Sequence, residues 1–363
     1  MKKRLIVVLC CVLAVLLVGG GVAWRFLPQP LNYPIGKIEA VGSSVEIVSE
    51  REDEIAIRKT GAEPFKVLMF TDMHLDGKNE TSYETVRHLV ENIQKEKPDL
   101  VLLGGDNVTS GLNGTRCRQL AKIFEKLGVY WAGVIGNHEG DNPWSVRRKR
   151  MVGIFAGYEH CLMRGGLRDV SGDCNYVLNV LRESDSILEA FFFLDTYDEM
   201  SNEQKARYGL DPEEDYYDGV REDQVEWYAR KVEDLRARYG HYSSVLLAHI
   251  PLPQVAAAAE KGEFLYGVQN EGVCCSGFDS GLFDAIKASG TTKAVFCGHD
   301  HLNTFGVSYE GILLSYIEPS GYGSYNMGNR RNAPESEWLQ GCTELTLLED
   351  GRFEQRQIRN HAQ

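Results

Sequence analysis

Five short segments between residues 72 and 301 place metal-binding side chains directly after runs of apolar residues. Each apolar run has the length and composition of a buried β-strand, so each polar group falls where a strand ends. Strands of an α/β sheet present their carboxyl ends at one edge, and five such ends that converge would bring these side chains together. The segments supply Asp72 and His74, Asp106, Asn137 and His138, His249, and His299 with His301. In the D-x-H segment we expect extended backbone, which would point the side chains of Asp72 and His74 in the same direction.

The types of side chain point to transition metals. Five of the nine histidines fall in these segments, beside carboxylates, an amide and several glycines. A mixed set of imidazole nitrogens and hard oxygens suits Fe, Mn or Zn better than Mg or Ca, which prefer shells of oxygen alone. We therefore expect two divalent transition metal ions. Glycines before the ligands are expected to let the backbone turn sharply, at Gly104, Gly105, Gly136 and Gly298.

Between residues 65 and 135 the chain alternates buried strands with amphipathic helices. This order predicts a βαβαβ unit with parallel strands, right-handed crossovers and a ligand crevice at the strand carboxyl ends. Downstream we expect a helix over residues 143–160, strands of a second sheet at 174–181 and 190–196, and an acidic, tyrosine-rich surface excursion at 198–219. Two stacked mixed sheets flanked by helices, a four-layer α/β/β/α sandwich, accommodate the whole order.

The first 28 residues differ from the rest of the chain. Basic residues at positions 2–4 precede an apolar run over residues 5–24, and Arg25 closes it. A run of about 20 residues can cross a bilayer of ~30 Å at ~1.5 Å per residue, whereas signal peptides have apolar cores of roughly 7–15 residues. We therefore expect residues 1–28 to form a single-pass anchor in the cell membrane, with the folded domain outside the cytoplasm. Secretion after signal cleavage is the alternative.

The remaining chain is expected to form one domain with a short preceding element. Residues 29–64 predict a β-hairpin on a sheet edge, with alternating strands over residues 37–47 and 54–58, and residues 65–363 predict the domain itself. With 363 residues and 43% hydrophobic content the chain can bury a large core. The formal net charge of -13 argues against nucleic acid as a bulk partner, because binding that releases counterions needs a basic face.

Taken in chain order, the polar segments resemble the motifs of the calcineurin-like metallophosphoesterase superfamily. Order and spacing agree as well as residue types, over about residues 65–309. Stretches at residues 191–196, 246–253, 280–301 and 320–325 are similar to the branch that contains plant purple-acid-phosphatase-like proteins and related fungal phosphatases. The superfamily motifs are D-x-H at Asp72, G-D at Asp106, G-N-H-E at residues 136–139, A-H at His249 and G-H-x-H at His299.

This resemblance implies a binuclear metal centre in an α/β/β/α fold. Two cations about 3.5–4 Å apart would clamp a phosphate group and lower the pKa of a bridging water, so that a metal-bridging hydroxide attacks phosphorus in line. By the same resemblance one metal would be held by Asp72, His74, Asp106 and His301, and the other by Asp106, Asn137, His249 and His299.

The resemblance assigns the catalytic proton to His138. This residue would protonate the leaving alkoxide or stabilise the charge that builds up on phosphate. Three residues after the Asp106 position the family commonly has a carboxylate, or a tyrosine in the purple enzymes, but this chain has Thr109. The carboxylate that would orient His138 and the tyrosinate that colours a ferric site are therefore both missing at their usual place.

The predicted function is the hydrolysis of phosphate monoesters of unknown identity. Family position suggests that Asp195, Glu271 and Tyr322 line the substrate pocket, with a structural role as the alternative. Two other functions stay open: a phosphodiesterase of the same fold, and a non-catalytic binding protein of the cell envelope whose metals serve stability. Loss of a ligand would be the signature of the binding protein, and the sequence has lost none.

Overall fold

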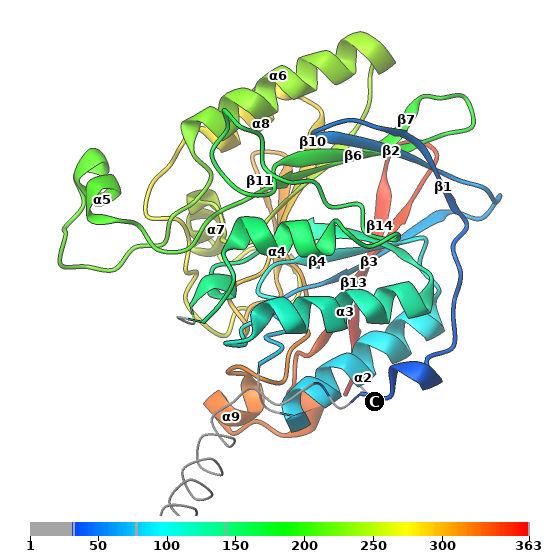
Figure 1. Ribbon diagram of the computed structural model, residues 1–363. Helices are drawn as coiled ribbons and strands as arrows, with labels where there is room; N and C mark the ends of the chain where they lie inside the picture. The colour runs from blue at the N-terminus through cyan, green and yellow to red at the C-terminus, as the bar shows by residue number, and fades with distance from the viewer. Residues whose placement is uncertain (1–30, 32, 77–78, 142–143, 362–363) are drawn as a thin grey trace, which may run out of the picture.

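The computed structural model describes residues 31, 33–76, 79–141 and 144–361. The predicted membrane anchor, residues 1–28, lies outside this part of the chain, in which no helix is long and apolar enough to cross a bilayer. Two β-sheets pack face to face, and helices cover the outer face of each (Figure 1). The predicted fold class is therefore confirmed. The described helices, with η for 3₁₀, are η1 (Ile35–Lys37), α2 (Asn79–Glu96), α3 (Asn113–Leu127), η2 (His138–Gly140), α4 (Arg148–Phe155), α5 (Asn202–Tyr208), α6 (Glu222–Tyr239), α7 (Pro253–Ala259), α8 (Leu282–Ser289), α9 (Met327–Arg331) and η3 (Glu335–Glu337).

The smaller sheet has the strand order β14-β13-β3-β4-β5. Its strands are β3 (Phe65–Phe70), β4 (Leu100–Gly104), β5 (Tyr130–Val134), β13 (Gly341–Leu347) and β14 (Phe353–Arg359). β3, β4 and β5 run parallel, with α2 and α3 as the connections, and Leu100 lies beside Val67 on one side and Tyr130 on the other. This is the predicted βαβαβ unit. β13 pairs in the antiparallel direction with the other edge of β3.

The larger sheet has the order β1-β2-β6-β7-β8-β10-β12-β11-β9. Its strands are β1 (Val45–Glu50), β2 (Glu54–Lys59), β6 (Tyr176–Leu181), β7 (Ile187–Leu194), β8 (Ser244–Ala248), β9 (Phe264–Tyr266), β10 (Thr292–Cys297), β11 (Gly306–Tyr309) and β12 (Ile312–Tyr316). The two strands predicted at residues 174–181 and 190–196 are β6 and β7 of this sheet. β7, β8, β10 and β12 are parallel neighbours, so their carboxyl ends share one edge.

The predicted N-terminal hairpin is formed by β1 and β2 at the outer edge of the larger sheet, where β2 pairs in parallel with β6. Its first strand is shorter than the alternation from residue 37 predicts. Residues Ile35–Lys37 form η1, and Gly42 has a left-handed backbone with φ of 80°. Because an extended strand cannot continue through that conformation, pairing starts only at Val45.

The helix predicted over residues 143–160 is also shorter, spanning Arg148–Phe155, and a side chain from a neighbouring helix explains its late start. Asn113 on α3 accepts a hydrogen bond from the backbone N–H of Val146 at 2.8 Å and donates one to the Val146 carbonyl at 3.1 Å. These bonds occupy the backbone groups that would otherwise belong to the first turn. The helix therefore begins at Arg148.

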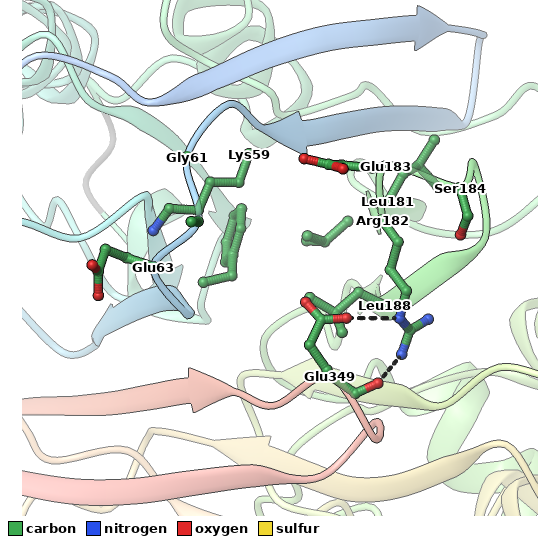
Figure 2. A pocket seen from close by; sticks show the side chains of 12 residues that line it. Lys59, Gly61, Glu63, Leu181, Arg182, Glu183, Ser184, Leu188 and Glu349 are labelled. Carbon is green, nitrogen blue, oxygen red and sulfur yellow. Dashed lines mark hydrogen bonds and ion pairs between the residues drawn. The ribbon is translucent and has the colours of Figure 1, made fainter.

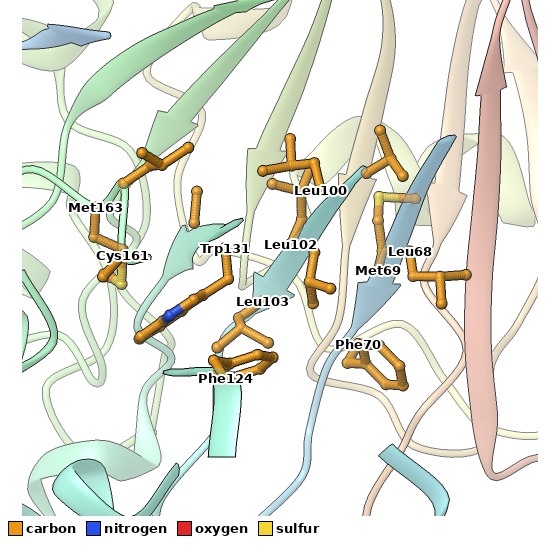
Figure 3. Packing of buried hydrophobic residues seen from close by; sticks show 14 of the residues in the cluster. Leu68, Met69, Phe70, Leu100, Leu102, Leu103, Phe124, Trp131, Cys161 and Met163 are labelled. Carbon is orange, nitrogen blue, oxygen red and sulfur yellow. The ribbon is translucent and has the colours of Figure 1, made fainter. Parts of the chain in front are cut away.

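Alternation along the strands separates two packing layers. In β8, Val245 and Leu247 belong to the core shared with the smaller sheet, whereas Leu246 and Ala248 belong to the core beneath α6 and α8. This period of two is expected of a strand that is covered on both faces. Figure 3 shows large apolar side chains of β3, β4 and β5, which belong to the same cluster as Val245 and Leu247. Among them Trp131 of β5 packs on Phe124 of α3, with ring centroids 4.8 Å apart. Each fully buried Leu or Phe contributes about 1.5–3 kcal/mol, so these layers fix the two sheets relative to each other.

Tyr176 links the two sheets by hydrogen bonds. Its buried hydroxyl on β6 accepts from the backbone N–H of Gly133 on β5 at 2.9 Å and donates to the Gly133 carbonyl at 2.8 Å. β5 is an edge strand of its sheet. The hydroxyl therefore takes the place of a neighbouring strand for these two backbone groups.

Tyr176→Phe should lower the free energy of unfolding by about 1–3 kcal/mol, because it leaves a buried donor and a buried acceptor unsatisfied. Denaturant unfolding measures the loss. Tyr158→Phe is the matched control, since it removes a hydroxyl at the surface that lies 3.4 Å from the Arg118 carbonyl, and it should change the free energy by less than about 0.5 kcal/mol. Equal losses in the two variants would contradict the linking role of Tyr176.

Candidate metal centre

Polar side chains from both sheets converge at one place. Their ligand atoms form two groups, each within 4.8 Å. Each group mixes residues that follow strands of the smaller sheet with histidines that follow strands of the larger one, so the centre exists only where the two sheets meet. The groups match the division expected from the sequence: Asp72 with His74 and His301, and Asp106 with His249 and His299.

Asp106 lies between the two groups. Its Oδ2 is 3.5 Å from His74 Nε2 and 3.2 Å from His249 Nε2, while its Oδ1 accepts the backbone N–H of His138 at 2.8 Å. Oδ2 is buried and accepts no hydrogen bond from the described residues. A buried carboxylate oxygen is costly unless something compensates its charge. Two metal ions that share this oxygen would do so.

Asn137 completes the second group. Its Oδ1 lies 3.0 Å from His249 Nε2 and 3.0 Å from His299 Nδ1. His249 Nδ1 donates to the Gly104 carbonyl at 2.8 Å, so in the neutral imidazole the Nε2 lone pair faces the amide oxygen. Lone pairs that converge in this way repel one another unless a cation lies between them.

His301 is oriented for the first group in the same manner. Its Nδ1 donates to the Tyr325 carbonyl at 3.0 Å, and the two rings stack with centroids 4.3 Å apart. Its Nε2 then lies 3.0 Å from His74 Nε2 and 3.4 Å from Asp72 Oδ1. A backbone carbonyl that fixes the tautomer of the histidine is the usual outer contact of a metal ligand.

Four ligand residues have a left-handed backbone, which is uncommon outside glycine. Their φ values are 54° at Asp72, 42° at His74, 49° at Asp106 and 78° at His299. The extended backbone predicted for the D-x-H segment is therefore wrong, although both of its side chains enter the same group. Backbone hydrogen bonds hold the strained segment in place. The N–H of Asp72 donates to the Gly105 carbonyl at 3.0 Å, and the N–H of His74 donates to the Asp106 carbonyl at 2.8 Å. Strain of this kind is often found at functional sites.

The glycines beside the ligands serve close approach more than sharp turning. Gly105 has a positive φ of 102°, as the turning hypothesis requires. At the other positions there is no room for a side chain. A Cβ on Gly136 would lie 2.2 Å from Asp106 Oδ1, and a Cβ on Gly298 would lie 2.6 Å from Asp72 Oδ2. Any side chain there would displace a ligand carboxylate.

Buried charged residues hold the ligand loops from behind. Glu139 accepts the backbone N–H groups of Asn107 at 2.7 Å and Gly136 at 2.8 Å, which ties the segment after β4 to the segment after β5. Arg148 donates to the Gly136 carbonyl and pairs with Asp195. Asp195 is fully buried in this pair, so it supports the loop and offers no surface to a substrate.

The other two residues suggested by family position also lie outside the ligand groups. Glu271 accepts a hydrogen bond at 3.1 Å from the hydroxyl of Tyr325, the residue that stacks on a ligand histidine. Tyr322 stacks against His88, and its hydroxyl is 2.7 Å from His361 Nε2. These contacts match the structural role that the sequence left open for both.

The structure adds residues that the sequence did not single out. α5 projects from the body of the molecule (Figure 1). Tyr217, which follows α5 in the chain, places its ring against that of His299 at a centroid distance of 4.4 Å. Asp141 contacts Nδ1 of His138. The spacing of three residues was a usable signal for Asp141, because such side chains eclipse in a 3₁₀ turn. Tyr217 and Tyr325 lie in stretches that the sequence singled out, residues 198–219 and 320–325, but no local pattern indicated that their rings pack on ligand histidines.

His138 lies beside the first group and is more exposed than the ligands. Its ring centroid is 5.5 Å from that of His74, and 43% of its side chain is exposed. Burial lowers its pKa, but the charge of Asp106 and the hydrogen bond and charge of Asp141 outweigh this and raise the pKa above its usual value. An accessible imidazole whose protonated form is favoured in this way is suited to donate a proton.

The ligand histidines differ in how readily they bind a metal. Burial lowers the pKa of His74 and of His299 to about 3, so both are neutral at pH 7 with lone pairs available. Burial also lowers the pKa of His249, but the negative charges of Asp106 and Asp72 outweigh this and raise that pKa to about 10. A metal ion must displace this proton, so the apparent metal affinity should fall as the pH falls.

A separate cavity of about 360 Å³ lies at the opposite end of β3 (Figure 2). Phe65, the first residue of β3, is in its wall, whereas the metal ligands follow the last residue of that strand. Lys59 in this cavity is paired with Asp99 at 2.7 Å, and Arg182 with Glu349 at 3.2 Å. With these cations neutralised, the cavity has little to attract a phosphate group, and it is not part of the metal centre.

Comparison with known proteins identifies the family. The family described as calcineurin-like phosphoesterase matches residues 65–303, a span that contains every ligand named above. The chain belongs to the calcineurin-like phosphoesterase family. Proteins of this family bind a dinuclear metal centre. The two Asp/His groups of this chain fit one, since the buried Oδ2 of Asp106 lies between His74 of one group and His249 of the other and accepts no hydrogen bond from the described residues.

Proteins of similar sequence or structure support the assignment to this family. "Probable inactive purple acid phosphatase 14" of Arabidopsis thaliana is 28% identical over 295 residues, which cover 72% of this chain and 71% of that protein. "Probable inactive purple acid phosphatase 29" of the same plant is 26% identical over 297 residues, with 72% and 73% covered. A dimetal phosphatase from Danio rerio shares the fold with a TM-score of 0.50 at 14% identity, over 82% of this chain and 97% of that one. The resemblance to purple-acid-phosphatase-like proteins is thereby confirmed.

Asp106→Ala should reduce the bound metal from two ions per chain toward none, because it removes the oxygen that both groups share. Elemental analysis after reconstitution with Mn, Fe or Zn measures this, and thermal unfolding provides a second readout. A chelator should lower the Tm of the wild type, since a metal that binds only the folded state stabilises it, and should leave the variant unchanged. Asp215→Ala, at a side chain that is 96% exposed, should keep both ions. If Asp106→Ala still bound two ions per chain, Asp106 would not be a ligand that both ions share.

Proposed function

We propose that this protein is an active phosphatase that hydrolyses phosphate monoesters at a centre of two Mn, Fe or Zn ions. The observation that carries the proposal is the ligand set joined through Asp106, with the accessible imidazole of His138 beside it. When bound, the two ions polarise a phosphate group and lower the pKa of water, so that a nucleophile forms near neutral pH. The mixture of imidazole and oxygen ligands favours these three metals.

The residues of the chain position the reactants and move the proton. His138 stands next to the ligands, and its backbone N–H holds Asp106 Oδ1 at 2.8 Å, which fixes the distance between the acid and the centre. Its Nε2 would donate a proton to the leaving alkoxide. Glu139 and the pair of Arg148 with Asp195 keep the loop of His138 in place, so little reorganisation is needed during reaction.

The printed names of the two plant relatives call them probable inactive, and that description belongs to those proteins. In this chain all seven ligand positions and the position of the proton donor carry residues able to perform the role. A non-catalytic envelope protein is the competing hypothesis. Its expected signature is a lost ligand, and this sequence does not have it.

The test compares an alkyl phosphate, 4-nitrophenyl phosphate and bis(4-nitrophenyl) phosphate as substrates of the metal-loaded protein. Both monoesters should be hydrolysed faster than the diester. A faster diester reaction would make the protein a phosphodiesterase. No hydrolysis of any substrate, with two metal ions bound, would favour the binding protein.

His138→Ala should keep both metal ions but lower kcat for the alkyl phosphate roughly 10²–10⁴-fold, the usual range for a positioned proton donor. The loss should be smaller for 4-nitrophenyl phosphate, because its leaving group is a weak base and needs little protonation. Steady-state rates with both esters and elemental analysis of the same preparation measure these effects. An equal loss on the two esters would mean that His138 acts on the phosphate oxygens instead.

We also propose that residues 1–28 anchor the protein in the cell membrane with the domain outside the cytoplasm, on the strength of the apolar run at residues 5–24 and the basic residues before it. Protease added to intact cells should then degrade the domain, while a cytoplasmic protein in the same cells survives. Full protection of the domain would contradict this topology. Recovery of the domain from the medium would indicate secretion after cleavage.

A further inference from the structure

The loop that follows the ligand Asn137 brings a carboxylate against the proposed proton donor. η2 starts at His138, and the backbone N–H of Asp141 donates to the His138 carbonyl, which closes a 3₁₀ turn. Because a 3₁₀-helix has about three residues per turn, the side chains of residues three apart eclipse each other. Asp141 Oδ2 accordingly contacts His138 Nδ1.

This contact occupies one of the two ring nitrogens. A carboxylate only accepts, so Nδ1 carries the hydrogen that is shared with Asp141, and Nε2 is the nitrogen that remains for a substrate. The backbone N–H of His138 is bound to Asp106 Oδ1. The main chain and the ring of His138 are thus fixed from two sides, one toward the metal ligands and one toward Asp141.

We propose that Asp141 is the positioning residue that orients the imidazole of His138, in the role of the carboxylate that this chain lacks at Thr109. The inference rests on the proposed function, since it assigns Asp141 a part in the proton transfer by His138. It places the orienting carboxylate in the same loop as the acid, three residues later, and not on the segment that follows β4.

Because the side chains of both residues are exposed, the positioning role of Asp141 can be distinguished from a contribution to folding stability. The side chains of His138 and Asp141 are 43% and 52% exposed, and exposed ion pairs contribute little to folding. Removing the Asp141 carboxylate should therefore leave the Tm and the metal content nearly unchanged. A positioning role predicts a lower kcat instead, with the KM of the substrate little affected.

The experiment is a double-mutant cycle in the full-length, metal-loaded protein. Asp141→Ala should lower kcat for an alkyl phosphate about 10- to 100-fold, the usual cost of losing the outer partner of a functional histidine, and less for 4-nitrophenyl phosphate. Asp141→Glu should recover part of the rate. His138→Ala with Asp141→Ala should be no slower than His138→Ala alone, because Asp141 acts only through that ring. Asp215→Ala should retain the wild-type rate.

A second measurement does not depend on turnover. In protein labelled with ¹⁵N-histidine, the proton on Nδ1 of His138 should give a downfield NMR signal, because the Asp141 carboxylate protects it from exchange with water. The signal is assigned by its loss in His138→Ala. Asp141→Ala should abolish it, and Asp215→Ala should preserve it.

Two results would overturn the role of Asp141: an unchanged Nδ1 signal in Asp141→Ala, or the same rate loss from Asp141→Ala with and without His138. Failure of the proposed function has a different signature, namely a wild type that binds two metals and hydrolyses none of the esters. The NMR comparison still decides the role of Asp141 in that case.

Discussion

Asp106 is a buried carboxylate that lies between the two ligand groups, and the rest of the site is arranged around it. One oxygen is held by the backbone of His138, and the other lies between His74 Nε2 and His249 Nε2. A buried negative charge is tolerated only where positive charge or hydrogen bonds compensate it. The histidines around Asp106 therefore come from strands of both sheets, and the position of one sheet on the other becomes a condition for function.

The fold supplies that condition through packing and a small number of polar links. The two core layers on either side of the larger sheet bury its central strands β6, β7 and β8 completely, and Tyr176 adds hydrogen bonds between β6 and β5. The ligand loops can then be strained, as the left-handed backbone at Asp72 and Asp106 shows. The surrounding structure determines their conformation more strongly than their own preference does.

Local patterns in the sequence predict the elements of this fold correctly, except where a group distant in the chain alters the backbone. Strand ends, ligand types and the βαβαβ order are local, and the structure bears them out. The first strand and α4 start later than predicted, because Gly42 adopts a left-handed backbone and Asn113 binds the backbone of Val146. Asp195 carried no local mark of its burial against Arg148, so a family position alone suggested a substrate contact that its geometry does not offer.

The sequence by itself determined which residues could bind metal, in what order, and at which strand ends, because hydrophobic periodicity and residue chemistry are properties of short segments. It also contained the spacing of three residues that places Asp141 over His138. Only the tertiary structure decided that Asp106 lies between two groups, that backbone carbonyls select Nε2 of His249 and His301 as the metal-facing nitrogens, and that Tyr217 and Tyr325 pack on ligand rings. These features depend on the packing of one sheet on the other, which arises from contacts between residues far apart in the chain and has no period that a single segment could display.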